Sequence, residues 1–266
     1  MKARFEDSDI KKHWTNQALR HGSSHQASWS DSRAIELEKS VLLGYLQENS
    51  KILDIGCSNG HATLTYAHHK NIDITGMDYV PEMIEAARKN LAENAAYLRG
   101  EVRFETGDIR ELPFADATFD TVMTTRVVIN LQNWDAQIRG IVECVRVVKP
   151  GGVVLLSEAT IQGLVAINRL RDELGMKPLS MPAFNLYLDS DQVASRSWGS
   201  HEPIQVVDFS STYYLLTRVL KPVLELLPGS KVKAVDPQSE VNRLAGLLPA
   251  WGDYGVQKLF ILRKKS

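Results

Sequence analysis

The segment Asp54-Ile55-Gly56-Cys57-Ser58-Asn59-Gly60 follows an apolar run and combines small residues with a carboxylate. Glycine lets the backbone turn sharply and lets a ligand approach the peptide closely. The spacing does not fit a dinucleotide fingerprint, because Ser58 and His61 stand at the second and third glycine positions counted from Gly56. It does not fit a phosphate-binding P-loop either, because no lysine follows Gly60.

The carboxylate of Asp54 indicates the kind of ligand that this turn would accept. It stands two residues before Gly56, where it would repel a pyrophosphate. It suits a ligand that carries a positive charge and no phosphate, and S-adenosylmethionine is such a ligand because it has a sulfonium and an α-ammonium group. A helix that begins near Gly60 would also point its free amide groups at the ligand.

Two further acidic residues stand where an adenosine would need them. Asp78 ends the second apolar run, about 20 residues after the first turn, and a carboxylate there can accept hydrogen bonds from both ribose hydroxyls. Asp108 follows the third apolar run, where its carboxylate could accept from the adenine amino group. Ile109 could then pack on the adenine ring.

Together these segments resemble the class I S-adenosylmethionine-dependent methyltransferase family. The resemblance covers roughly residues 50–160, in the family's order and spacing. The segments are the turn at 54–60, Gly76-Met77-Asp78-Tyr79, Pro81-Glu82-Met83-Ile84, Gly107-Asp108-Ile109, Leu112-Pro113-Phe114, Phe119-Asp120 and Lys149-Pro150-Gly151-Gly152. One departure is Ser58, where the family usually has glycine.

The resemblance implies S-adenosylmethionine as the cofactor and a role for each matching residue. Gly56 would lie against the methionine portion, Asp78 would hold the ribose, and Asp108 would hold the adenine. The expected cofactor-binding residues are Asp54, Gly56, Cys57, Gly60, Asp78, Tyr79, Met83, Asp108, Ile109 and Thr125. Simpler interpretations stay open: Asp54 as a helix cap, Asp78 and Asp108 as turn residues, and Tyr79 and Met83 as packing residues.

Candidate residues for binding the methyl acceptor come from the segments that follow the fourth and fifth predicted strands, from the N-terminal region and from the insert. Open α/β sheets bind ligands at the carboxyl ends of their strands. The expected catalytic residues are His25, Arg126 and Glu158. Arg126 could hold an anionic acceptor or form a surface ion pair. Glu158 could be a base or a helix cap, and His25 a base or a surface residue.

Alternating apolar elements must position these residues. Strands are predicted at 51–55, 72–77, 102–105, 119–124, 153–157, 204–209 and 257–262, and helices at 33–46, 60–69, 81–90, 134–147, 161–174 and 212–227. Such alternation implies right-handed crossovers and a parallel sheet. The predicted fold class is α/β: a Rossmann-like, seven-stranded, mostly parallel sheet with helices on both faces.

Four regions are expected along the chain. Residues 1–48 would form an N-terminal helical lid, although 1–32 show no clear period, and 49–160 the cofactor-binding core. Residues 161–203 would form an insert over the acceptor pocket, with Asn185, Tyr187 and Trp198 as candidate lining residues. Residues 204–266 would complete the sheet.

Composition narrows the class of partner. The formal net charge of the 266 residues is -1, which disfavours nucleic acid because it predicts no strong field toward phosphates. The sequence has no apolar stretch near the ~20 residues of a membrane span, no signal-peptide pattern and no metal-ligand spacing. Two cysteines fit a reducing compartment. We therefore expect a cytoplasmic monomer or homodimer without a metal or a membrane partner.

The predicted function is methyl transfer to an oxygen or nitrogen of a small molecule, such as a sugar or a secondary metabolite. The N-terminal region and the insert favour a lidded pocket of small-molecule size. Two alternatives stay open: a methyltransferase that acts on RNA or protein, and a non-catalytic subunit that keeps the fold to bind a partner.

Overall fold

In the computed structural model, which describes residues 6–22, 31–199 and 201–266, seven strands form one sheet in the order β3-β2-β1-β4-β5-β7-β6. The strands are β1 (Lys51–Ile55), β2 (Asp73–Asp78), β3 (Glu101–Thr106), β4 (Phe119–Thr125), β5 (Val148–Ala159), β6 (Gln205–Val207) and β7 (Gln257–Arg263). β7 is antiparallel to both of its neighbours, and the remaining pairs are parallel. The predicted fold class is confirmed.

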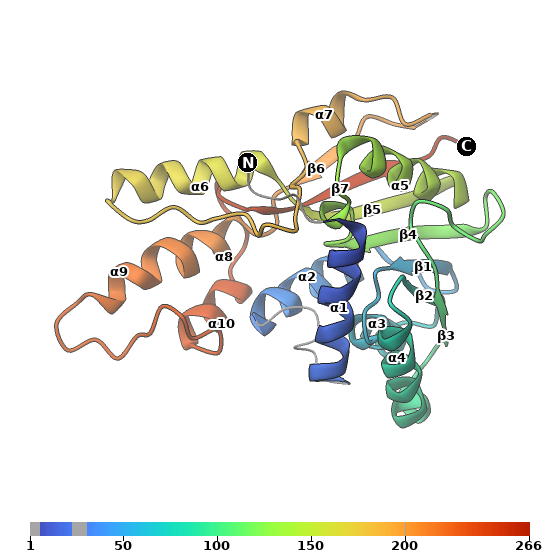
Figure 1. Ribbon diagram of the computed structural model, residues 1–266, viewed down its shortest axis with the longest axis horizontal. Coiled ribbons are helices and arrows are strands. Elements are labelled where there is room, and N and C mark those ends of the chain that lie inside the picture. Colours follow the sequence, from blue (N-terminus) through green and yellow to red (C-terminus); the bar gives the residue numbers. More distant parts are fainter. Residues whose placement is uncertain (1–5, 23–30, 200) are drawn as a thin grey trace.

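Helices cover both faces of the sheet (Figure 1). The longer ones are α1 (Asp7–His21), α2 (Ser32–Tyr45), α3 (His61–His69), α4 (Pro81–Asn94), α5 (Trp134–Val147) and α6 (Ile161–Glu173). The shorter ones are η2 (Ala95–Tyr97), η3 (Val128–Asn130), α7 (Ser190–Ser195), α8 (Ser211–Leu215), the π-helix η4 (Leu216–Leu220), α9 (Lys221–Glu225) and α10 (Glu240–Leu247).

The alternation of side chains along each strand produces two hydrophobic cores. Ile52 and Leu155 join the core that α2 and α3 complete, whereas Leu53 and Leu156 join the core that α5 and α6 complete. Burial on both faces explains why the central strands are almost wholly apolar in sequence. The sheet is therefore a rigid platform whose carboxyl-end loops carry the polar residues.

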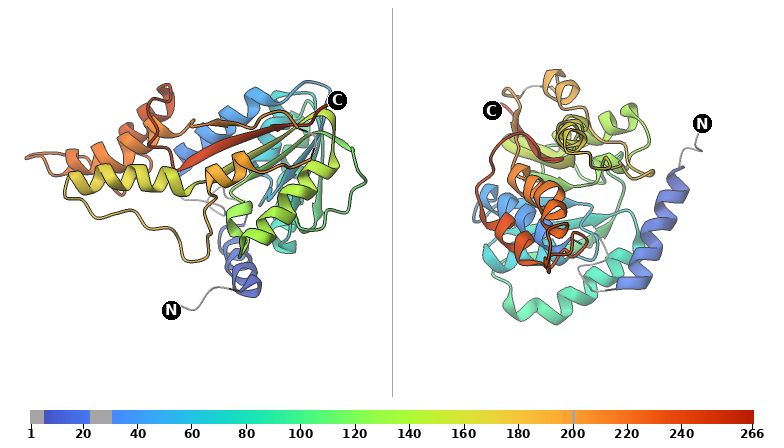
Figure 2. Two further views of the ribbon diagram at one scale, coloured as in Figure 1. Left: turned by 90° about the horizontal axis from the view of Figure 1, so that it is seen from above. Right: turned by 90° about the vertical axis from the view of Figure 1, so that its left-hand side faces the viewer.

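The N-terminal helix α1 was not predicted by periodicity. It has a buried stripe at a spacing of four residues, with Ile10 and Ala18 buried and Trp14 half-buried between them. This stripe packs beside α4, as Figure 2 also shows. Three apolar residues among charged neighbours give a weak sequence signal, so the contact with α4 decides the helix.

Between β6 and β7 the chain makes a helical excursion over residues 211–248. Its helices α9 and α10 lie away from the sheet (Figure 1). A buried polar network ties the excursion to α2, because Asp31 accepts hydrogen bonds from the Tyr213 hydroxyl (2.6 Å) and from Arg218 (2.7 Å). Asp31 also caps α2 by accepting from the Ala34 amide. Within the described ranges, no helix has the length and apolar character to cross a membrane.

Candidate active site

A cavity of about 280 Å³ opens at the carboxyl ends of the parallel strands. The segments that follow β1, β2, β3, β4 and β5 all contribute to its lining, as expected for a sheet of this kind. Helix α1 and the segment 182–187 supply further walls. The lining is mostly apolar with a few polar groups, which is typical of small-molecule sites.

The turn after β1 is held in a conformation that favours glycine. Gly56 has φ +74°, and a Cβ atom there would lie 2.1 Å from Cγ2 of Val127. Ser58 also takes a left-handed conformation, with φ 51°, which explains why the family usually has glycine at this position. Both residues line the cavity, so this turn forms part of the cavity wall.

Asp78 lies at the end of β2 and lines the same cavity. Its carboxylate accepts hydrogen bonds from the backbone amides of Ser58 and Val80, each at 3.0 Å. Burial raises the pKa of this carboxyl to about 6, although the two amide hydrogen bonds act to lower it. The Asp78 carboxylate thus ties the turn after β1 to the end of β2, and it can still accept hydrogen bonds from further donors.

Asp54, Cys57 and Gly60 lie behind the turn, outside the residues that line the cavity. Asp54 is buried and accepts a 2.6 Å hydrogen bond from the Thr63 hydroxyl, and burial raises its pKa to about 7. Cys57 is a buried thiol in a small apolar cluster, and a Cβ on Gly60 would lie 2.5 Å from the ring of Phe104. These residues shape the turn from behind.

The loop after β3 places Ile109 and Asp108 in the cavity wall. Asp108 has its carboxylate engaged by the guanidinium of Arg110 (2.6 Å), which also forms an ion pair with Asp7 of α1. Burial acts against ionisation of Asp108, but Arg110 more than offsets it and lowers the pKa of the carboxyl. The sequence missed Arg110 and Asp7 because the pairing joins residues 103 positions apart.

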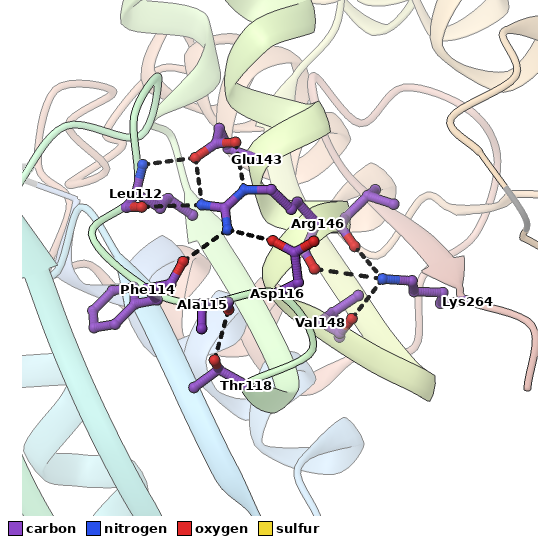
Figure 3. A network of polar contacts seen from close by, with 10 residues as sticks. Leu112, Phe114, Ala115, Asp116, Thr118, Glu143, Arg146, Val148 and Lys264 are labelled. Carbon is purple, nitrogen blue, oxygen red and sulfur yellow. Dashed lines mark hydrogen bonds and ion pairs between the residues drawn. The ribbon is translucent and has the colours of Figure 1, made fainter.

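Arg146 of α5 fixes the remainder of this loop (Figure 3). Its guanidinium donates to the carbonyl oxygens of Leu112 (3.0 Å) and Phe114 (2.7 Å) and pairs with Glu143. Glu143 in turn accepts from the Leu112 amide at 2.8 Å. The loop after β3, which also contains Asp108 and Ile109, is therefore held against α5 by its residues 112–114.

Tyr79 and Met83 meet α1 at the edge of the cavity. Met83 packs with Val80 and Ala18, and the rings of Tyr79 and Trp14 border this cluster. The Tyr79 hydroxyl is buried without a hydrogen-bond partner among the described residues, and Tyr79 lines the cavity. A buried hydroxyl in this condition is costly unless a ligand supplies the partner.

Thr125 ends β4 and Arg126 follows it, and both residues line the cavity. Arg126 has φ 56°, and two hydrogen bonds hold its backbone. Its amide donates to the Ser157 carbonyl oxygen (2.8 Å), and the side chain of Asn130 donates to its carbonyl oxygen (2.7 Å). Its half-buried side chain forms an ion pair with the buried Glu38 of α2, at 3.4 Å between Nε and Oε2. The structure thus pairs Arg126 with a residue that the sequence analysis did not single out.

Glu158 is fully buried and does not line the cavity. Its carboxylate accepts from the Thr124 hydroxyl (2.8 Å) and from the amides of Val127, Val128 and Ile129. Burial raises its pKa to about 7, against the effect of those hydrogen bonds. Glu158 thus binds the backbone at the start of η3, whereas the sequence left it open as a cap of the next helix, α6, which Thr160 caps instead. Its role as a base stays a prediction.

The insert contributes the rest of the wall. Asn185 and Tyr187 line the cavity, whereas Trp198 is buried in the core beside Trp134. His13 of α1 stacks on Phe184 at 4.7 Å between ring centroids, so the lid helix and the insert meet over the cavity. The lining residues that the sequence analysis missed include Asp7, Ile10, Trp14, Arg110, Phe184, Tyr214 and Gln257.

His25 lies outside the described residues, so the structure gives it no position. Within the described ranges, no three His, Cys, Asp or Glu side chains are grouped so that they could hold a metal ion.

Comparison with known proteins assigns the cofactor-binding core to a family. A family model described as a methyltransferase domain matches residues 52–152. Residues 52–152 are a methyltransferase domain. The segment contains Gly56, Asp78 and Asp108, and it lies within the seven-stranded, mostly parallel sheet.

Known methyltransferases match about half of the chain. A segment of 133 residues, 48% of this chain and 46% of the relative, is 32% identical to an uncharacterised methyltransferase of Schizosaccharomyces pombe. A ubiquinone/menaquinone biosynthesis C-methyltransferase of Geotalea daltonii is 29% identical over 46% of this chain and 51% of its own length. The chain thus spans about half the length of the curated relatives it matches.

The whole fold also has solved counterparts. A phosphoethanolamine N-methyltransferase of Haemonchus contortus, solved with S-adenosyl-L-methionine, superposes with a TM-score of 0.58 at 16% identity. That likeness covers 100% of this chain and 59% of the other. At this identity it establishes the fold of the methyltransferase domain and its appendages.

Proposed function

We propose that this protein transfers a methyl group from S-adenosylmethionine to an oxygen or nitrogen atom of a small molecule. One observation carries the proposal: a single cavity runs from the Gly56 turn and Asp78 to a wall made by the insert. The end at Gly56 and Asp78 would face the cofactor, and the end at the insert would face the acceptor. The methyltransferase-domain match over residues 52–152 supports the cofactor half.

The residues at the first half of the cavity fit this cofactor. A Cβ on Gly56 would collide with Val127, so the turn requires glycine, and a ligand in the cavity could lie against its backbone. Asp78 would accept from the ribose hydroxyls, Ile109 would pack on the adenine, and the Tyr79 hydroxyl would gain a partner. When bound, the cofactor supplies a methyl group on a positively charged sulfur.

The protein's main contribution to the reaction would be positioning. Holding an acceptor in line with the methyl group can supply on the order of 7–11 kcal/mol. The loop that contains Thr125 and Arg126 and the wall from Asn185 and Tyr187 would hold the acceptor. The acceptor's proton leaves to solvent or to a base, for which His25 stays the sequence-based candidate.

The lid favours a small acceptor over a macromolecule. The His13–Phe184 stack joins α1 to the insert above the cavity, and a contact of this kind favours an acceptor small enough to enter beneath it. We also propose that the protein works in the cytoplasm as a monomer or homodimer. A non-catalytic partner-binding role is the second candidate, and cofactor binding distinguishes the two.

Calorimetric titration tests the cofactor assignment. We expect S-adenosylmethionine and S-adenosylhomocysteine to bind, and we expect NADH and FAD to give no heat of binding. Asp78→Ala should weaken S-adenosylhomocysteine binding by at least ~1.5 kcal/mol, about tenfold, because a charged hydrogen bond to the ligand is lost.

Asp73→Ala is the matched control, because Asp73 lies at the other end of β2, with its side chain partly exposed. It should leave the dissociation constant unchanged. An Asp78→Ala variant that binds as tightly as wild type, or a wild-type protein that prefers NADH, would overturn the proposal.

A further inference from the structure

We propose that the acceptor end of the cavity is built for an uncharged, aromatic ring compound bearing a hydroxyl or amino group, and that the buried Glu38–Arg126 pair makes it reject anions. The proposal rests on the proposed function, because it concerns the second half of the same cavity. It departs from the sequence-based expectation that Arg126 holds an anionic acceptor.

Arg126 is the charged side chain in this half of the lining, among the residues that the structure describes. The other charged lining residues, Asp7, Asp78, Asp108 and Arg110, belong to the cofactor half. Arg126 therefore decides whether the acceptor end attracts a negative charge.

Glu38 compensates that charge from behind. Its side chain is 4% exposed, it does not line the cavity, and its Oε2 lies 3.4 Å from Nε of Arg126. Its other oxygen accepts from the Ser157 hydroxyl and from Gln257 Nε2 (2.7 Å), so the carboxylate is held in place. A pair of this kind presents no net charge to the acceptor.

A second cation near the acceptor end is compensated in the same way. Arg218 lies near the Tyr214 ring, and its guanidinium bonds the buried carboxylate of Asp31 at 2.7 Å. An anionic acceptor would thus lose its hydration without gaining a counter-charge of its own. That cost is several kcal/mol for a buried ion, so an anion is disfavoured.

The remaining lining of the acceptor end favours a ring. Phe184, Tyr187 and Tyr214 contribute aromatic surface, and aromatic rings attract one another in stacked or edge-on arrangements. The polar groups are hydroxyls and amides. Asn185 donates to Asn130 (2.8 Å), and Gln257 donates to Glu38 (2.7 Å) and to the Ser157 carbonyl (3.3 Å), so the side-chain oxygens of Asn185 and Gln257 remain acceptors. Such oxygens accept hydrogen bonds from a neutral hydroxyl or amine and repel a carboxylate.

The test compares two probes with the same ring system, 2-naphthol, which is neutral at pH 7.5, and 2-naphthoate, which is an anion. Each is titrated into the full-length protein saturated with S-adenosylhomocysteine. We expect wild type to bind 2-naphthol at least tenfold more tightly than 2-naphthoate. Glu38→Gln should shift the ratio of the two dissociation constants toward 2-naphthoate by about tenfold, because it removes the negative charge that faces the Arg126 guanidinium.

Two further variants make the result specific. Glu38→Gln/Arg126→Gln should lose the gain in 2-naphthoate binding, whereas Glu240→Gln, which removes a carboxylate from an ion pair on the distant α10, should leave the ratio unchanged. A wild-type preference for 2-naphthoate would overturn the inference, and so would failure of both probes to bind while S-adenosylhomocysteine binds. The wild-type comparison decides the matter even if Glu38→Gln does not fold. Failure of S-adenosylhomocysteine to bind would instead count against the proposed function.

Discussion

At the scale of single residues, the sequence analysis named several residues that line the cavity around the Gly56 turn, whereas Asp54, Cys57 and Gly60 lie behind that turn. Gly56, Asp78, Tyr79, Met83 and Ile109 all line the cavity, because they stand at fixed positions after predicted strands. Topology brings such positions to one edge of a parallel sheet, whatever the surrounding packing. Their roles toward the cofactor stay predictions.

The buried carboxyl of Asp78 makes cofactor binding sensitive to pH. Its pKa is about 6 in the free protein, and the ribose hydroxyls would hydrogen-bond best to its ionised form. Binding should therefore weaken as the pH falls below about 6, approaching tenfold per pH unit. The measurement is the dissociation constant of S-adenosylhomocysteine between pH 5 and pH 8.

Asp78→Asn is the control for this dependence, because an amide does not titrate. The variant should bind weakly but with a flat profile across this range. If its profile kept the wild-type slope, another group would be responsible.

At the scale of elements, the lid depends on contacts that no local pattern announces. Trp14 of α1 lines the cavity, and its ring lies edge-on to Phe184 of the insert at 6.2 Å. Asp7 at the start of the same helix pairs with Arg110 of the loop after β3. Helix α1 is thus held to the loop that carries Asp108 and to the insert.

We expect Trp14→Ala to weaken S-adenosylhomocysteine binding about tenfold, mainly through faster dissociation, because changes at an interface act mostly on the off-rate. Stopped-flow displacement of the bound ligand measures it. Leu19→Ala lies on the same helix with a side chain 73% exposed, and it should leave the rate unaltered. Equal off-rates in wild type and Trp14→Ala would show that α1 does not close the cavity.

At the scale of the whole molecule, two buried carboxyls shape stability. Burial raises the pKa values of Asp54 and Glu158 to about 7 each. Between about pH 4 and pH 7 the folded state then holds protons that the unfolded chain has released. The free energy of unfolding should therefore fall as the pH rises through this window, by up to about 1.4 kcal/mol per pH unit for each group, and level off above pH 7.

Asp54→Asn should flatten this decline and should melt at a higher temperature than wild type at pH 8. The amide can still accept from the Thr63 hydroxyl but carries no charge to bury. Melting curves of the ligand-free protein at pH 5.5 and pH 8 measure the effect. Asp73→Asn, at the partly exposed start of β2, should behave as wild type, and an Asp54→Asn variant with an unaltered slope would contradict the account.

The sequence by itself determined the platform: the order of strands and helices, the Gly56 turn, and the acidic ends of β2 and of the loop after β3. These follow from local periodicity and from turn chemistry, which act between residues close in the chain. Only the tertiary structure decided that α1 is a helix beside the cavity and that the Glu158 carboxylate accepts hydrogen bonds from the amides of η3. It also decided that Arg126 is paired with Glu38, because these contacts join residues far apart in sequence, and the energy of burying a charge depends on which partner the fold delivers.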